Sequence, residues 1–161
     1  MQTLETILAE HPFFQDISPQ YMPLITGCAS NVRYSGGAYI FREGEDATNF
    51  YILRHGKIAL ETYVPQHGPI IIETIEAGEV LGWSWLFPPY RWHFSARVVE
   101  PTRAIALDGI CLRHKSEEDH DFGYDLLKKV AHIMMDRLQA TRIQLLDMYN
   151  VPSPFTPLER S

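Results

Sequence analysis

The stretch IFREGEDATNFYILRHGKI, residues 40–58, decides how this sequence folds. Its first apolar segment ends in an acidic turn centred on Gly44, and its second, residues 50–54, ends just before Gly56. Glycine at the first position permits a backbone conformation that a side chain would hinder. Glycine at the second permits a tight hairpin. The stretch therefore predicts short strands joined by tight turns.

The same alternation of short apolar segments and turn residues extends from residue 31 to residue 107. Regular turn signals of this kind are typical of a small β-sandwich or barrel. No helix-length periodic segment interrupts them, which argues against a parallel α/β sheet. The predicted strands are residues 38–41, 50–54, 57–64, 69–75, 80–82, 93–99 and 102–107.

Helical patterns flank this strand-rich region on both sides. Residues 3–10 predict a short helix, and Ser18 followed by Pro19 is a start signal for a second one. Asp108 stands where an N-cap belongs, and residues 121–148 predict a long helix. We therefore predict an α+β fold class, an antiparallel β-roll or jelly roll with N-terminal helices and a long C-terminal helix.

The long helix carries an apolar seam whose members lie three or four residues apart, close to a heptad pattern. Burial against the β body alone could produce such a stripe. Apolar residues also occupy a second face of the helix, however, and a helix that is apolar on two sides usually has two partners. We expect a homodimer formed through residues 121–148. The seam residues are Leu127, Val130, Met134, Leu138, Thr141, Leu145 and Met148.

Length and composition indicate one globular domain. The chain has 161 residues and a formal net charge of −6, which argues against direct contact with nucleic acid because phosphate binding needs a basic surface. No segment approaches a membrane span of about 18 apolar residues, so we expect no membrane partner and a cytoplasmic location. Cys28 and Cys111 form no disulfide or zinc pattern, and we expect reduced, buried thiols. We assign residues 1–150 to the domain and residues 151–161 to a proline-rich tail.

Three further segments make the strand pattern specific: GEVLG at residues 78–82, SARV at 95–98 and DRLQAT at 136–141. Together with residues 40–58 they resemble the catabolite-activator-like branch of the cyclic-nucleotide-binding domain family. The resemblance covers about residues 5–148. It implies a short helix and loop, the phosphate-binding cassette, whose backbone amides cup the cyclic phosphate. It also implies an arginine paired with that phosphate and a glutamate that accepts from the ribose 2′-hydroxyl.

Both charged anchors of the family are missing from this cassette. Trp83 follows Gly82 where the family has its glutamate, and Phe94 precedes Ser95 where it has its arginine. A hydrogen bond to a charged group contributes about 1.5–3 kcal/mol, so the two losses together weaken binding by about 10²–10⁴-fold. Arg91 is the nearest substitute cation, although it could instead stack on a neighbouring aromatic ring, that of Trp92 or Tyr90.

Arg97 is the second candidate cation, and strand alternation predicts that it points outward if Ala96 points inward. Three interpretations of the aromatic loop stay open: its rings fill the old pocket, line a pocket for a different ligand, or form a protein-docking surface. His93 alone is a weak signal for a haem or metal ligand. The candidate ligand-binding residues are Leu81, Gly82, Trp83, Ser84, Trp85, Arg91, His93, Phe94, Ser95, Ala96 and, from the long helix, Thr141.

The functional prediction is a regulatory domain that senses a ligand or a partner and is not an enzyme. No nucleophile elbow, phosphate loop or metal-ligand spacing is evident in the sequence. Relatives carry a helix-turn-helix after the dimer helix, and we expect this chain to lack that DNA-binding domain. We also expect it not to bind cyclic AMP in the usual way. No cofactor is expected, although a cyclic nucleotide or an unknown small ligand stays open. The alternatives are a conventional cyclic-AMP receptor module and a protein-interaction module that binds no ligand.

Overall fold

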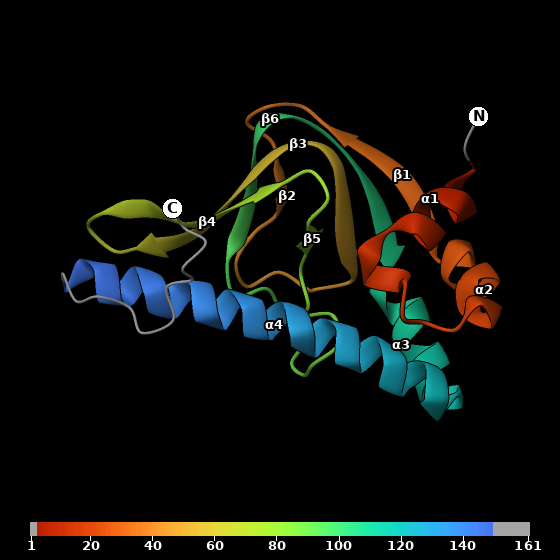
Figure 1. Cartoon of the computed structure of the whole chain (residues 1–161). Helices are drawn as coiled ribbons and strands as arrows, with labels where there is room; N and C mark the ends of the chain where they lie inside the picture. The colour runs from red at the N-terminus through yellow and green to blue at the C-terminus, as the bar shows by residue number, and fades with distance from the viewer. Residues whose placement is uncertain (1–2, 150–161) are drawn as a thin grey trace, which may run out of the picture. The chain divides into compact units, whose positions relative to one another are not determined.

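The structure, a computed structural model, describes residues 3–149. Its strands form a curled antiparallel sheet. The hydrogen-bonded strand order is β1-β6-β3-β4, with β2 paired to β6 and β5 paired to β3 (Figure 1). This arrangement confirms the predicted α+β fold with an antiparallel β-roll. The strands are β1 (Ala29–Tyr34), β2 (Tyr39–Phe41), β3 (Asn49–Val64), β4 (Gly68–Glu76), β5 (Val80–Leu81) and β6 (Ser95–Asp108).

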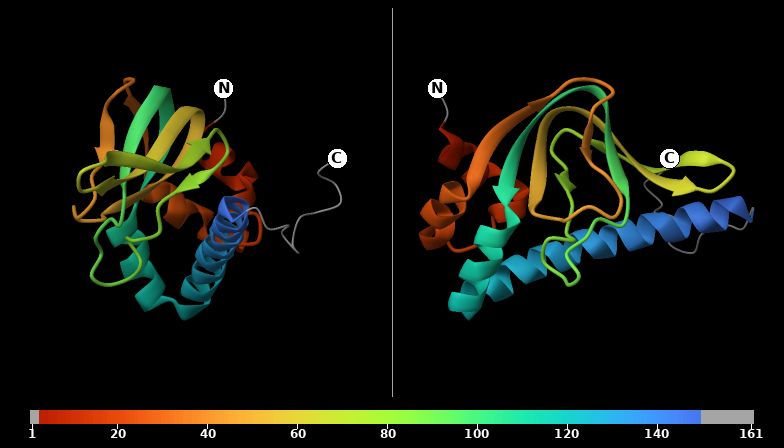
Figure 2. Two further views of the ribbon diagram at one scale, coloured as in Figure 1. Left: turned by 90° about the vertical axis from the view of Figure 1, so that its left-hand side faces the viewer. Right: turned by 180° about the vertical axis from the view of Figure 1, so that it is seen from behind.

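Two long strands, β3 and β6, each replace a predicted pair of shorter ones. Their pairing register shifts repeatedly between Leu53 and Ile58, so the chain bends there without leaving the sheet. Gly56, with φ +106°, lies within this bend, and the predicted hairpin at this position is wrong. A bulge admits an extra residue and bends a strand while its pairing continues. Figure 2 shows both strands curving over the roll.

Strand β1 was not among the predicted strands. It pairs antiparallel with β6 along its whole length, from Ala29 opposite Leu107 to Tyr34 opposite Thr102. None of its residues is fully buried. Its sequence therefore lacks the strict apolar alternation that identifies a half-buried strand.

The core of the roll is apolar and drawn from several strands. Because both faces of the central strands are covered where the sheet curls, consecutive residues of β3 are buried instead of every second one. Fully buried side chains from four strands include Ile58, Ile75, Leu81, Val98 and Ile105.

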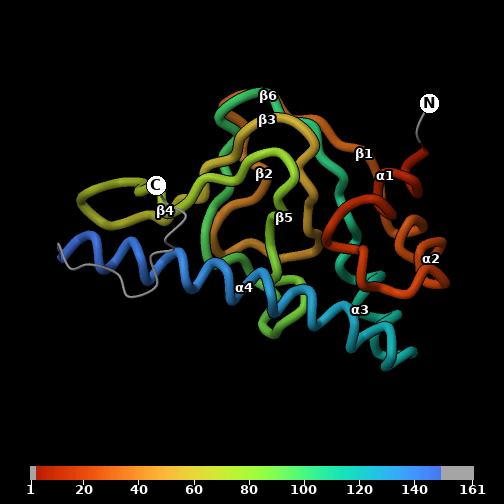
Figure 3. Tube along the Cα trace, viewed as in Figure 1, coloured from red at the N-terminus to blue at the C-terminus, as the bar shows by residue number. Residues whose placement is uncertain are grey.

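Helices flank the strands in the chain order that the sequence predicts (Figure 3). The predicted cap at Asp108 is confirmed, since its Oδ1 accepts from the amides of Ile110 and Cys111 at 3.0 and 3.1 Å. Ser18 makes no side-chain cap bond and precedes a 3₁₀ turn, Pro19–Tyr21, before the next helix begins. The α-helices are α1 (Leu4–Glu10), α2 (Met22–Gly27), α3 (Gly109–Glu118) and α4 (His120–Met148).

The two cysteines form a disulfide, which corrects the expectation of reduced thiols. The fold brings Cys28, at the C-terminal end of α2, beside Cys111 in α3. Their Cα atoms lie 6.1 Å apart although 83 positions separate them in sequence. That separation is within the range of protein disulfides.

The chain divides into two compact units, the first ending at Asp125 and the second beginning at Leu126. The predicted tail, residues 151–161, lies outside the described residues. Among the described helices, none combines the length and apolarity needed to cross a membrane.

Candidate functional site

The predicted cassette is the loop of residues 82–94 between β5 and β6. No helix is assigned within it, so the short helix of the family's cassette is replaced by turns. Two backbone bonds close these turns, from the Leu86 amide to the Trp83 carbonyl at 3.1 Å and from the Tyr90 amide to the Phe87 carbonyl at 2.9 Å. Without a helix, the loop has no helix N-terminus to attract a phosphate.

Trp85 anchors the first half of the loop in the core. Its side chain is fully buried and stacks on Phe50 with ring centroids 4.9 Å apart. Its carbonyl accepts a 2.6 Å hydrogen bond from Nη1 of Arg113 on α3. Gly109, at the start of α3, supplies the room, since a Cβ atom there would lie 2.7 Å from the Cβ atom of Trp85. The loop is thus held by packing and by a cation from α3.

Trp92 anchors the second half of the loop. Its ring stacks almost parallel on Phe41 at 3.7 Å, and Phe94 packs against both rings. Gly82, with φ +98°, permits this stack, because a Cβ atom there would lie 2.5 Å from the indole ring. Trp92 and Phe94 are buried, whereas Trp83 is half-buried. Aromatic packing therefore holds the second half of the loop.

Arg91 contacts the turn centred on Gly44. Its Nη1 donates to the Gly44 carbonyl at 3.0 Å and lies 3.2 Å from Oδ1 of Asp46. The alternative that Arg91 stacks on Trp92 or Tyr90 is therefore not the arrangement found. The guanidinium of Arg113 lies over the Tyr90 ring instead, 3.9 Å from its centroid.

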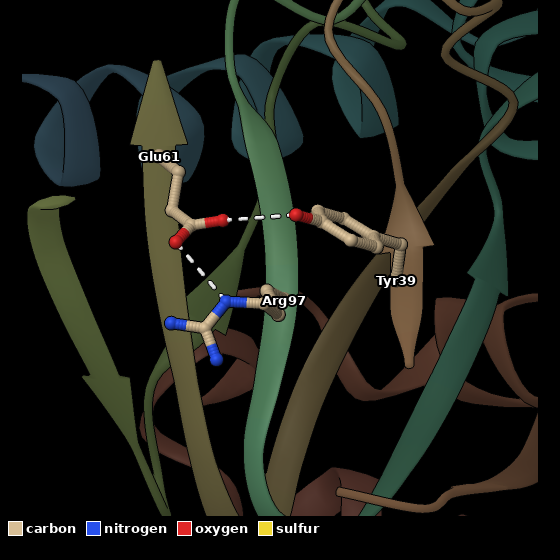
Figure 4. Close-up of polar contacts among 3 residues, drawn as sticks. All are labelled: Tyr39, Glu61 and Arg97. Carbon is tan, nitrogen blue, oxygen red and sulfur yellow. Dashed lines mark hydrogen bonds and ion pairs between the residues drawn. The ribbon is translucent and has the colours of Figure 1, made fainter. Parts of the chain in front are cut away.

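Arg97 is likewise paired, with a partner that sequence reasoning missed. Figure 4 shows its Nε donating to Oε2 of Glu61 at 3.0 Å, while the Tyr39 hydroxyl donates to Oε1 at 3.3 Å. Glu61 is only 5% exposed, whereas the side chain of Arg97 is 32% exposed. Ala96 is fully buried, which confirms the predicted alternation of these two β6 residues. The one signal for this cluster in the sequence was an acidic residue inside an apolar strand.

The remaining candidate residues differ in burial and in position. Leu81 and Ser84 are buried, whereas His93 is exposed on the loop. The Ser95 hydroxyl, at the start of β6, accepts from the Glu43 amide at 2.9 Å. Thr141 lies in α4, where its hydroxyl donates to the Arg137 carbonyl one turn earlier at 2.8 Å. Its predicted reach to a ligand stays a prediction.

Metal-ligating chemistry finds no support in this region. Within residues 3–149, no group of three or more His, Cys, Asp or Glu side chains lies close enough to hold a metal ion. The loop 82–94 is an aromatic segment with buried anchors at Trp85 and Trp92 and an exposed tip, and Arg91 and Arg97 have carboxylate partners.

The family model for the cyclic nucleotide-binding domain matches residues 31–119 of this sequence. The match spans every strand from β2 to β6 and includes the whole loop of residues 82–94. No curated protein matches the sequence.

Solved structures with the same fold come from several bacteria. A Geobacter metallireducens GS-15 protein, named for cyclic nucleotide binding, is 26% identical with a TM-score of 0.77, covering 85% of this chain and 99% of that one. The sensor domain of the transcriptional regulator DNR from Pseudomonas aeruginosa is 20% identical with a TM-score of 0.68, covering 84% and 91%. The N-terminal domain of a transcriptional regulator from Streptomyces coelicolor A3(2) is 20% identical with a TM-score of 0.65, covering 83% and 96%. The names of these structures describe binding and regulatory proteins, not enzymes.

Proposed function

Because this chain belongs to the cyclic nucleotide-binding domain family, we propose that it is a regulatory domain and not an enzyme. It senses a ligand or a partner at the loop of residues 82–94 and transmits the signal through the long helix α4. Such transmission requires that the ligand or partner bind one helix arrangement more tightly than another.

This domain does not bind cyclic AMP through the family's charged anchors. The observation that carries this proposal is that both substitute cations already have partners, Arg91 with Asp46 and Arg97 with Glu61. A phosphate bound to either arginine would lie beside that arginine's carboxylate and would be repelled by it. The ring of Trp92, a residue of this loop, is also buried and stacked on Phe41.

Calorimetry with cyclic AMP and cyclic GMP tests this proposal. We expect no micromolar binding, since the missing anchors weaken the family's interaction by about 10²–10⁴-fold. Micromolar binding that Arg91→Ala abolishes would instead establish the alternative, a conventional cyclic-nucleotide receptor. Arg42→Ala is the matched control, because Arg42 lies at the turn that Arg91 contacts, and its guanidinium stacks on Tyr39 and pairs with no carboxylate among the described residues.

A protein-interaction module is the second candidate, and the tip of the loop favours it. Phe87 is 38% exposed, and the adjoining Pro88 and Pro89 are also exposed. An exposed aromatic ring on a proline-stiffened loop is a plausible anchor for a partner protein. Native mass spectrometry of protein purified from its own host separates the two candidates, because a retained small molecule and a retained protein differ in mass. Any contact with DNA would be made by a partner chain, given the net charge of −6.

The second part of the proposal is a homodimer formed through α4. Within the second unit, seam residues Leu127, Leu138 and Leu145 are exposed, with Leu138 at 62%. Seam residues that stay exposed at this spacing are suited to a second copy of the same helix.

Sedimentation at tens of micromolar tests the dimer. We expect a dimer for the native chain and a monomer for Leu138→Glu, because a carboxylate at the seam would be buried without a partner. Met135→Glu is the control, since Met135 is 47% exposed but lies off the seam. A native monomer, or equal dissociation by both variants, would contradict the proposal.

The cytoplasm is the compartment that we propose. The Cys28–Cys111 disulfide makes this testable, because structural disulfides are rare in cytoplasmic proteins. Alkylation of thiols at the moment of cell lysis should find a substantial share of Cys28 and Cys111 reduced if the protein is cytoplasmic, and full oxidation of both would contradict the proposal.

A further inference from the structure

A pocket of about 420 Å³ lies where β1 ends and β6 bends, away from the loop of residues 82–94. Figures 1 and 2 show the end of β1 and the bends of β3 and β6 gathered at this end of the roll. No aspartate or glutamate lines the pocket. Its lining residues are Arg33, Tyr34, Ser35, Gly36, Pro101, Thr102 and Arg103.

The two arginines of this pocket stand directly opposite each other. Arg33 on β1 is the cross-strand partner of Arg103 on β6. Side chains at opposed positions lie on the same face, about 4.5–5.5 Å apart at Cβ, and like charges there repel. Both arginines are exposed, and within residues 3–149 neither has an ion pair or hydrogen bond through its side chain. The sheet thus keeps a repulsive pair that nothing in the described chain neutralises.

Most arginines among the described residues have a partner, unlike these two. Among the nine arginines of residues 3–149, six have a side-chain partner or an interaction: Arg42, Arg91, Arg97, Arg113, Arg137 and Arg142. The chain also carries 20 acidic residues against 14 basic ones, so carboxylates are abundant. A paired set of unneutralised arginines on an acidic protein indicates that the neutralising charge comes from outside.

A third basic residue extends the cluster across the sheet. His55 on β3 is the cross-strand partner of Arg103 on its other side and is also exposed. The Ser35 hydroxyl at the pocket has no hydrogen bond within the described residues, so it is available as a further donor. The two arginines and Ser35 supply two fixed positive charges and several N–H and O–H donors around one concave site, and His55 lies outside its lining.

We propose that this pocket binds the phosphate group of a small molecule, with Arg33 and Arg103 as its anchors. Two opposed guanidinium groups carry two charges and match a phosphate dianion, whose oxygens accept paired N–H bonds. A volume of about 420 Å³ suits a ligand of metabolite size. The site shares no residue with the loop of residues 82–94, so it does not depend on what that loop senses.

Calorimetry with pyrophosphate, at constant ionic strength, tests the site. We expect Arg33→Gln and Arg103→Gln each to weaken pyrophosphate binding by about 10- to 100-fold, as expected for the loss of charge-assisted hydrogen bonds. Arg54→Gln is the matched control. Arg54 also lacks a partner within the described residues, but it does not line the pocket, so its loss should change affinity less than about twofold.

Thermal unfolding separates a binding role from a structural one. Without ligand, neither substitution should lower the unfolding midpoint, because each removes a repulsive neighbour. Pyrophosphate should raise the midpoint of the native chain and of Arg54→Gln but not that of Arg103→Gln. Three results would overturn the proposal: equal weakening by Arg54→Gln, no stabilisation beyond that of sodium chloride, or stronger binding of citrate than of pyrophosphate. The last would assign the site to carboxylates.

Discussion

Glu61 on β3 and Arg97 on β6 form an ion pair between neighbouring strands, with Arg97 Nε 3.0 Å from Glu61 Oε2. The pairing register places Ser95 opposite Glu61, so Arg97 is its diagonal neighbour on the adjacent strand. The Tyr39 hydroxyl approaches the other carboxylate oxygen from β2. One carboxylate therefore joins three strands of the sheet.

Substituting Glu61 should destabilise the protein measurably. We expect Glu61→Gln to cost about 1–2 kcal/mol, less than for a fully buried pair because Arg97 is partly exposed and can be rehydrated. Tyr39→Phe should cost about 0.5–1 kcal/mol by removing one hydrogen bond. Urea unfolding measures both, with Glu100→Gln as the control, an exposed carboxylate with no ion pair among the described residues. A cost for Glu61→Gln no larger than the control's would contradict this account.

Gly82 should be far less tolerant of a side chain than Gly78. Both have positive φ, +98° and +92°, so alanine is strained at either position. A Cβ atom at Gly78 would meet nothing within 4 Å, whereas one at Gly82 would strike the ring of Trp92. We expect Gly78→Ala to cost about 1–2 kcal/mol and Gly82→Ala about 1–3 kcal/mol more.

Tryptophan fluorescence gives the second readout of this prediction. Gly82→Ala should move Trp92 off Phe41 and change the emission spectrum, and Gly78→Ala should leave the spectrum unchanged. If both variants lose equal stability with unchanged emission, the close packing of Gly82 on Trp92 is not what requires glycine there.

The turns around β2 and β3 could be predicted because their cause is local. Gly44 adopts φ +88°, a conformation that side chains disfavour, and the sequence marks it with an acidic turn. The cap at Asp108 is local for the same reason, since its partners lie two and three residues ahead. Features of this kind follow from neighbouring residues alone.

The candidate site depends on contacts between residues that are distant in sequence, and such contacts could not be predicted from the sequence. The absence of the family's two charged anchors could be predicted, because Trp83 and Phe94 stand at their positions in the sequence. The role of Arg91 could not, because Asp46 comes beside it only through a bridge between two loops. Strand β1 was not predicted, for a related reason. Its pairing with β6 holds it in the sheet, and its own residues show no apolar face.

Removing the disulfide should lower stability substantially. Cys28 and Cys111 are 83 positions apart, so the bond restricts a long loop of the unfolded chain. Cys28→Ala should therefore cost about 2–5 kcal/mol. Chemical unfolding with and without reductant measures this, and Cys111→Ala serves as the matched variant. Reductant should destabilise the native chain and leave both variants unchanged. An equal effect of reductant on the variants would show that it acts elsewhere.

Protonation of His11 should destabilise the fold at mildly acidic pH. Its Nε2 lies 2.9 Å from the Gly78 carbonyl, to which it donates, while Nδ1 accepts from the Phe13 amide at 3.1 Å. Both bonds are made by the neutral ring, and protonation of Nδ1 would break the second. Burial lowers the pKa of His11 below its ordinary value of 6.5, against the smaller opposing effect of the bond to Gly78.

A lowered pKa in the folded state fixes the sign of the pH dependence. The unfolded chain binds the proton more readily, so the contribution of neutral His11 is complete above pH 6.5 and is lost as the pH falls below it. We expect the free energy of unfolding of the native chain to fall between pH 7.5 and pH 5.5, measured in urea. His11→Asn is the control, because asparagine can accept from the Phe13 amide and does not titrate. Its free energy of unfolding should fall less over the same interval, and an equal decline in both proteins would assign the pH dependence to other groups.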